Sequence, residues 1–192
     1  MSDIKWKVDG FADTANVSTT AREWTLEALK IISFATLAAI IYGILHDQVT
    51  AHVSVEYFTI AHPPVFPTQS PFLLAIGWGI IATWWVGLPL GILLAVAARL
   101  GRNAKCGLGD LRRKIVLLMI VSGCTAMIAG VTGASLFAMH VMELTGEWAT
   151  VIPKSRWPYF AFALWAHSAS YLVGVLGGMF LVGTVLKRRL DA

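Results

Sequence analysis

The sequence predicts an all-α membrane protein with four transmembrane helices in an antiparallel bundle. Its composition supports this fold class, since 57% of the 192 residues are apolar and only 14% are charged. Soluble globular proteins have about 25% charged residues. The chain also contains four long apolar stretches, each reaching the roughly 20 residues that a helix needs to cross a hydrocarbon core about 30 Å thick. The predicted helices span about 24–46, 72–98, 115–142 and 159–186.

The basic residues predict the orientation of these helices. Thirteen of the 15 Lys and Arg residues lie near the N-terminus, between the second and third helices, or after the fourth helix. The other two, Lys154 and Arg156, lie between the third and fourth helices. By the positive-inside rule, this asymmetry places both termini in the cytoplasm. The net charge of +4 then reflects orientation and contact with anionic lipid, so we expect no nucleic-acid partner.

Residues 1–19 are predicted to form a cytoplasmic N-terminal arm without regular structure, and residues 20–192 a single transmembrane domain. The arm is polar and lacks a short apolar core followed by a small-residue cleavage site, so we do not expect a cleaved signal peptide. Thr20–Glu23 matches a capping box, which predicts that the first helix starts there. Cys106 and Cys124 are too far apart for a disulfide and lack CxxC spacing, which indicates two reduced thiols.

A substantial outer segment connects the first two helices. It contains no Pro or Gly before Ile60, so it either continues the first helix beyond the bilayer or forms an amphipathic helix at the interface. Prolines then predict an extended, turning path into the second helix; these are Pro63, Pro64, Pro67 and Pro71.

Small residues recur at helical spacing in the last three helices and predict close packing. The second helix has Gly87 and Gly91 around Pro89, where a kink is expected. The others are Ala126, Gly130, Ala134, Gly174 and Gly178. Such faces also suit a membrane-protein partner or a second copy of the chain. Trp84 and Trp85 fall near the middle of the second helix, where they either line a cavity or permeation path or pack in the core.

The histidines carry the main functional signal, because imidazole is the commonest ligand of transition metals. In the predicted topology all five lie at the outer face: His46, His52, His62, His140 and His167. At about 1.5 Å per residue, three of them reach a depth of about 28 to 38 Å from the cytoplasmic boundary on different helices. We therefore predict that His46, His140 and His167 converge on one metal site near the outer interface.

Three acidic residues accompany the histidines. Asp47 follows His46, Glu143 lies one helical turn beyond His140, and Glu56 lies one turn beyond His52. They are candidate ligands, or partners that orient an imidazole.

This donor set suits zinc, iron or copper. A di-iron site is less favoured, because the order His140–Glu143 reverses the Glu-x-x-His pattern and has no second copy. The alternative is that each histidine is an interfacial residue bonded to water, lipid headgroups or the backbone.

Several familiar chemistries are absent from the sequence. It contains no P-loop, no Rossmann glycine fingerprint, no HExxH and no GxSxG motif. The central parts of the predicted helices carry no acid or base, which argues against an intramembrane proton relay or a charge-lined pore.

The run HDQVTAHVSVEYFTIAHP, followed by ATWWVGLPLG, resembles a family of uncharacterised four-pass bacterial inner-membrane proteins. The resemblance covers roughly the first half of the chain. It implies a location in the bacterial inner membrane and supplies no activity.

The sequence thus favours an integral membrane protein with a His/carboxylate metal site at the outer, periplasmic end of the bundle. If the site is catalytic, an open coordination position would activate water or oxygen. A structural or metal-delivery site would need the same residue types, so the sequence does not decide whether the protein is an enzyme. The alternatives are a non-enzymatic accessory subunit of a larger membrane complex and a pH-responsive channel or transporter.

Overall fold

The computed structural model describes residues 3–101 and 105–191, and for residues 3–21 it describes the backbone alone. Within these residues every regular element is helical. Four segments are long and apolar enough to cross a membrane: Arg22–Val53, Pro71–Arg99, Leu108–Ala138 and Lys154–Leu190. The predicted all-α class with four membrane-crossing segments is therefore confirmed.

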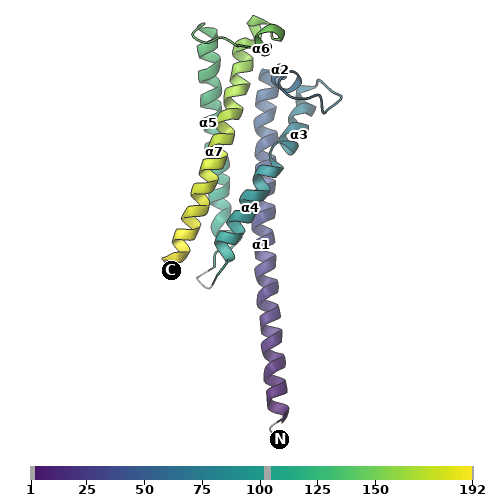
Figure 1. The fold of residues 1–192 in the computed structure, drawn as a ribbon, viewed down its shortest axis with the longest axis vertical. Coiled ribbons are helices and arrows are strands. Elements are labelled where there is room, and N and C mark those ends of the chain that lie inside the picture. Colours follow the sequence, from purple (N-terminus) through teal and green to yellow (C-terminus); the bar gives the residue numbers. More distant parts are fainter. Residues whose placement is uncertain (1–2, 102–104, 192) are drawn as a thin grey trace.

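The two short helices mark one end of the molecule. In chain order the helices are α1 (Asp3–Val53), α2 (Val55–Thr59), α3 (Pro71–Ile81), α4 (Trp84–Arg99), α5 (Leu108–Ala138), α6 (Glu147–Val151) and α7 (Trp157–Leu190), with a 3-10 turn at Lys154–Arg156. Helices α2 and α6 lie at one end, and α4 and α7 finish towards the other (Figure 1). We call the first of these the α2/α6 end.

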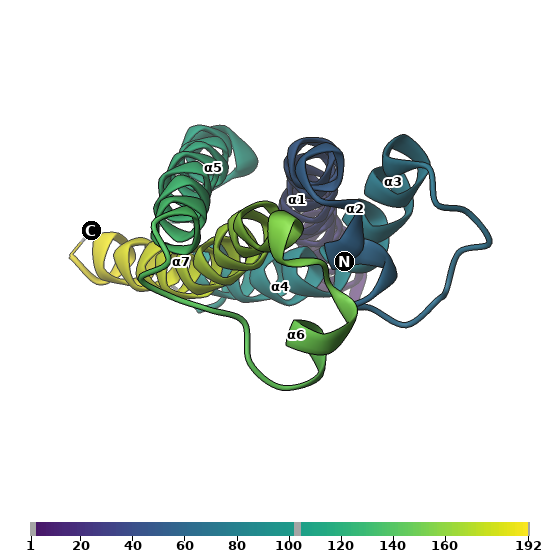
Figure 2. The same ribbon diagram turned by 90° about the horizontal axis from the view of Figure 1, so that it is seen from above.

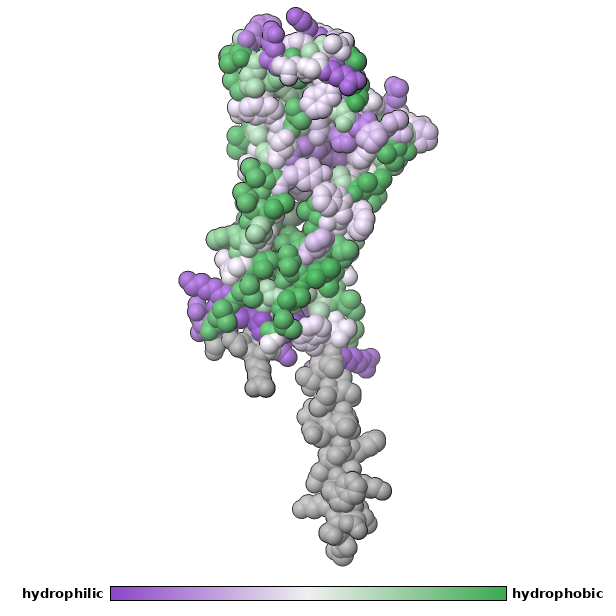
Figure 3. All heavy atoms as spheres, viewed as in Figure 1, coloured by the Kyte–Doolittle hydropathy of each residue, from purple (hydrophilic) through white to green (hydrophobic). Residues whose placement is uncertain are grey.

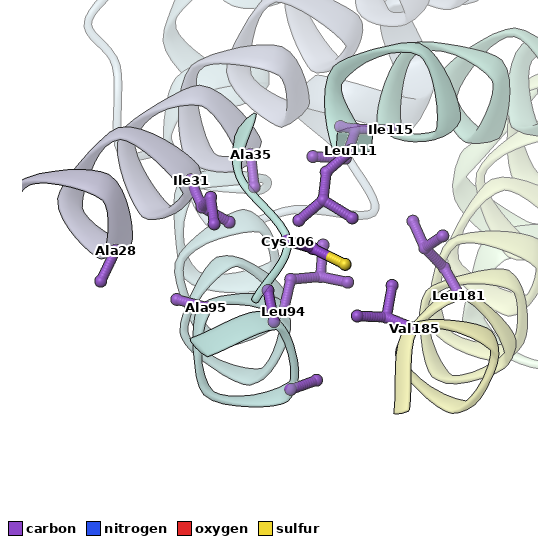
Figure 4. Close-up of a cluster of buried hydrophobic side chains, with 12 residues drawn as sticks. Ala28, Ile31, Ala35, Leu94, Ala95, Cys106, Leu111, Ile115, Leu181 and Val185 are labelled. Carbon is purple, nitrogen blue, oxygen red and sulfur yellow. The ribbon is translucent and has the colours of Figure 1, made fainter. Parts of the chain in front are cut away.

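The long helices pack in two groups that meet through α1 and α5 as well as through α4 and α7. Helix α1 lies along α3 and α4, and α5 lies along α7. Seen from above, α4 and α7 run along one side of α1 and α5 (Figure 2), and α1 also contacts α5 directly. One buried cluster joins all four segments with small and branched residues, among them Ile31, Leu94, Ile115 and Val185 (Figure 4). Hydrophobic side chains cover the middle of the visible surface and hydrophilic ones gather towards its ends (Figure 3).

A close backbone contact fixes α3 against the second half of α1. A Cβ atom on Gly79 would lie 2.6 Å from both the backbone N and the Cα of Ile44. Real Cβ atoms do not approach backbone so closely, so only glycine permits this spacing. The contact holds α3 beside the turn of α1 that precedes His46.

Helix α1 is longer at both ends than predicted. It begins at Asp3, whereas residues 1–19 were expected to lack regular structure, and it runs on through His52 to Val53. The outer segment therefore begins as a continuation of α1, the first of the two alternatives. Ser54 then adopts an extended conformation, and the short helix α2 follows.

The second membrane segment is interrupted at Ala82–Thr83 and not at Pro89, which lies within the continuous helix α4. The Tyr171 hydroxyl of α7 donates a hydrogen bond of 3.3 Å to the Ala82 carbonyl at the interruption. Trp84 and Trp85 follow it, with 46% and 54% of their surface exposed. This exposure contradicts the predicted alternative in which the two tryptophans pack in the core.

Candidate metal centre

Two imidazoles and one carboxylate meet between α1 and α7. His46 and Asp47 lie on α1, and His167 lies on the part of α7 nearest the α2/α6 end. One ligand atom from each of the three lies within 4.8 Å of the others, and all three side chains are buried. The rings of His46 and His167 meet edge to face, with centroids 4.6 Å apart. The sequence therefore brings together the ligand types that borderline transition metals prefer.

The hydrogen bonds of His167 fix which nitrogen faces the group. Its Nδ1–H donates to the Ala163 carbonyl, one turn earlier in α7, at 2.8 Å. Its Nε2 lies 3.1 Å from Oδ1 of Asp47. In a neutral ring Nε2 then carries the lone pair, because the proton resides on Nδ1. Two acceptors would face each other at this distance, so either a proton or a metal ion is needed between them.

His46 contributes a buried ring whose polar atoms are unsatisfied. Among the residues that the structure describes, neither Nδ1 nor Nε2 has a hydrogen-bond partner. A buried polar group without a partner costs about 1–3 kcal/mol. A metal ion bound to one of these nitrogens would remove part of that cost. The arrangement therefore fits a ligand better than it fits packing alone.

The ligand atoms lie within 4.8 Å of one another, and one of the distances between them already matches a single bound ion. Two atoms that each bind a metal at about 2.0–2.1 Å lie about 2.8–3.4 Å apart at octahedral or tetrahedral angles. The separation of His167 Nε2 and Asp47 Oδ1, 3.1 Å, falls within that range. Three protein ligands would leave a fourth position of a tetrahedral ion for water or another small ligand.

Aromatic side chains enclose the group and position its rings. The Tyr57 and Phe58 rings of α2 contact His167 at centroid distances of 4.4 and 5.6 Å. The Tyr42 ring stacks on His46 at 5.7 Å. The Tyr42 hydroxyl also shares a 2.7 Å hydrogen bond with Ser170 of α7. Helix α2 therefore covers the group from one side, which gives the outer segment a structural role in the site.

His140 and Glu143 do not join this group, contrary to the predicted three-helix convergence. Helix α5 ends at Ala138, and His140 turns the chain with a positive φ of 57°. Both side chains are exposed in the segment that follows. The apolar run continues to Met142, so hydropathy alone overestimates the length of this helix. The three-histidine site is corrected to two histidines and Asp47.

Glu56 binds an arginine and not the histidines. Its two carboxylate oxygens accept hydrogen bonds from Nε and Nη2 of Arg156, at 2.6 and 3.0 Å. Ser54 Oγ donates to the same carboxylate, and Arg156 also reaches the Val53 carbonyl at the end of α1. Burial raises the pKa of Glu56, but the hydrogen bonds from Arg156 and Ser54 outweigh it, and the pKa lies below its usual value. We infer that Glu56 ties α2 to the start of α7.

The two remaining histidines have separate partners. His52 is exposed, and its Nδ1–H donates to the Gln48 carbonyl. His62 donates to the Tyr57 carbonyl and packs against the Trp78 ring at 4.7 Å. His62 therefore supports Tyr57, which in turn contacts His167. The contacts of Tyr42 and Tyr57 with the histidines were not predicted from the sequence, although Tyr42 lies one helical turn before His46.

No protein-family model, curated protein or solved structure matches the chain significantly. The functional assignment accordingly depends on the geometry of the group formed by His46, Asp47 and His167.

Proposed function

We propose that this chain is a multi-pass protein of the bacterial inner membrane that binds one transition-metal ion through His46, Asp47 and His167. Zinc, iron and copper all suit two imidazoles and a carboxylate. The observation that carries the proposal is that both ring nitrogens of His46 are buried without a hydrogen-bond partner among the described residues, in a ring whose centroid lies 4.6 Å from that of His167. A structural histidine of this burial would be expected to find an acceptor.

The proposed orientation places the metal near the periplasm. The basic residues lie mainly in the first part of α1, around the connection between α4 and α5, and in the last turn of α7. The positive-inside rule then favours an antiparallel bundle with cytoplasmic termini and a periplasmic α2/α6 end. In this orientation metal ions from the periplasm can reach the site, and α2 covers the ligands on one side.

The test is metal binding by the detergent-purified chain. Elemental analysis after chelator-free purification should find about one zinc, iron or copper ion per chain. Substitutions His46→Ala and His167→Ala should each lower metal affinity by at least about tenfold. Even the loss of a residue that only hydrogen-bonds a metal ligand lowers metal affinity by about 10–100-fold. His52→Ala and His140→Ala are matched controls at exposed positions and should bind as the wild type does. A wild-type chain that is metal-free and takes up no added metal would contradict the proposal.

A further inference from the structure

The three candidate metal ligands are closed off from water within the part of the chain that the structure describes. The exposed fractions of His46, Asp47 and His167 are 7%, 4% and 8%. On the side away from the α2/α6 end, a 2.7 Å hydrogen bond between the Tyr42 and Ser170 hydroxyls joins α1 to α7 one helical turn from the ligands. The groove between α1 and α5 that touches His46 is lined almost wholly by apolar side chains, which a hydrated ion does not cross. An ion from solution can therefore enter only when part of the structure moves.

Helix α2 covers His167 at the α2/α6 end, and its own backbone holds it weakly. It has five residues, and Ser54 separates it from α1 with an extended backbone, φ −146° and ψ 97°. A helix of this length is not stable on its own in water, so its position depends on the contacts of its side chains. The buried rings of Tyr57 and Phe58 contact His167, at centroid distances of 4.4 and 5.6 Å. Moving α2 away would therefore uncover a candidate ligand directly.

Arg156 holds the start of α2 across the break at Ser54. Its Nε and Nη2 donate hydrogen bonds of 2.6 and 3.0 Å to the two carboxylate oxygens of Glu56, and Nη2 also donates to the Val53 carbonyl at 3.2 Å. Val53 ends α1 and Glu56 belongs to α2, so one guanidinium joins the two helices. We call Glu56 and Arg156 the clamp. The Arg156 side chain is 36% exposed, so water competes for the hydrogen bonds of the clamp and they can break.

The other end of α2 is attached to α3. His62, which follows α2, donates from Nδ1 to the Tyr57 carbonyl at 2.8 Å, and its ring packs against Trp78 of α3 at 4.7 Å. Neither contact involves the clamp. Opening of the clamp therefore releases the start of α2 from α7 while its other end stays beside α3, as in a hinged lid.

We propose that α2 is a hinged lid over the metal centre, closed by the Glu56–Arg156 clamp, and that its opening sets how fast metal ions enter and leave. This inference rests on the proposed metal site and concerns the exchange of its metal with solution. Burial of Tyr57 and Phe58 favours the closed state, so exchange should be slow in the wild type. Weakening the clamp should speed entry and release alike and leave the dissociation constant nearly unchanged, because neither clamp residue is a candidate ligand.

Asp47→Cys tests the lid without any metal, because position 47 is buried and lies outside the groove. In the full chain without its native cysteines, a small cationic thiosulfonate that stays in water should label this thiol slowly. Adding Glu56→Gln should raise the labelling rate by about fivefold, the effect of losing a partly exposed ion pair. Glu143→Gln makes the same change at an exposed position and should leave the rate as it is. Equal rates with and without Glu56→Gln would overturn the proposal.

Zinc exchange tests the lid in the chain with all three ligands. Glu56→Gln should speed zinc uptake and release by about fivefold each and change the dissociation constant by less than about twofold. In Glu56→Cys/Arg156→Cys, a short bifunctional thiosulfonate that bridges the two cysteines should slow zinc release to the wild-type rate or below. A monofunctional thiosulfonate on the same variant should leave release fast. Because the two treatments differ only in the bridge, equal release rates would show that α2 is not a lid.

The two experiments separate the lid from the metal site. A chain that binds no zinc contradicts the proposed function, and the labelling of Asp47→Cys still decides whether α2 opens. Bound zinc whose exchange is the same with and without the clamp or the bridge contradicts the lid and leaves the metal site standing.

Discussion

His167 Nε2 lies 3.1 Å from Asp47 Oδ1, while its Nδ1–H is committed to the Ala163 carbonyl. The second contact orients the ring from within α7, and the first joins α7 to α1. In metal sites a ligating histidine commonly donates its other N–H to a carbonyl or carboxylate, which fixes the tautomer. The His167–Ala163 hydrogen bond supplies that feature here.

Removing the charge of Asp47 tests its role as a ligand. Asp47→Asn keeps the size of the side chain but replaces an anionic oxygen with a neutral amide. We expect zinc affinity to fall by about 10–100-fold, measured by isothermal titration with a competing chelator. Asp110→Asn, near Arg188 at the opposite end of the molecule, is the control and should leave affinity unchanged. Equal affinities in all three proteins would exclude Asp47 from the site.

The Glu56–Arg156 pair should make stability depend on pH. Because the folded-state pKa of Glu56 lies below its ordinary value of 4.5, its contribution is present above that value and is lost as pH falls through the folded-state pKa. At pH 7, Glu56→Gln should lower the free energy of unfolding by about 1 kcal/mol, since Arg156 is partly exposed and screened.

The difference in the free energy of unfolding between wild type and Glu56→Gln should shrink as the pH is lowered below about 4.5. Unfolding in SDS at several pH values measures this difference. Glu143→Gln, at an exposed position, should change stability by less than about 0.5 kcal/mol at every pH. A Glu56→Gln deficit that stays constant through this range would show that the carboxylate charge is not its source.

The contact between Gly79 and Ile44 predicts an asymmetric effect of alanine. At Gly79 the added Cβ would collide with backbone, and we expect a loss of about 1–3 kcal/mol in the free energy of unfolding. At Gly174 the same change meets open space and should be neutral or stabilising, because alanine favours helix. Unfolding in SDS measures both variants. Equal stability of the two would mean that α1 and α3 are not so closely packed.

Thiol labelling tests the proposed orientation. Native Cys106 is buried and is therefore a poor reporter. Ser155 and Lys187 are exposed, so Ser155→Cys and Lys187→Cys are suitable in a background without the native cysteines. On intact cells, an impermeant maleimide should label Ser155→Cys and should label Lys187→Cys only after permeabilisation. The reverse pattern would place the α2/α6 end in the cytoplasm.

Hydropathy and charge were sufficient to predict the four apolar segments, because a membrane-crossing helix requires a long continuous run of apolar residues with few charges. Counting depth along each helix also placed His46 and His167 near the same level. The depth counted for a residue does not tell which way its side chain points around the helix axis, and it does not tell where the helix ends. His140 was misplaced because α5 ends at Ala138 with no Pro or Gly to mark it. The partner of Glu56 is Arg156, 100 residues away, and no local pattern links them.

X-ray absorption at the zinc edge of the metal-loaded chain tests the central claim most directly, because it counts imidazole ligands by their scattering. The account predicts two imidazole nitrogens and at least one oxygen at about 2.0–2.1 Å. His46→Ala should show one imidazole, and His140→Ala should still show two. A wild-type spectrum without imidazole scattering, or one that loses an imidazole in His140→Ala, would contradict a metal site built from His46, Asp47 and His167.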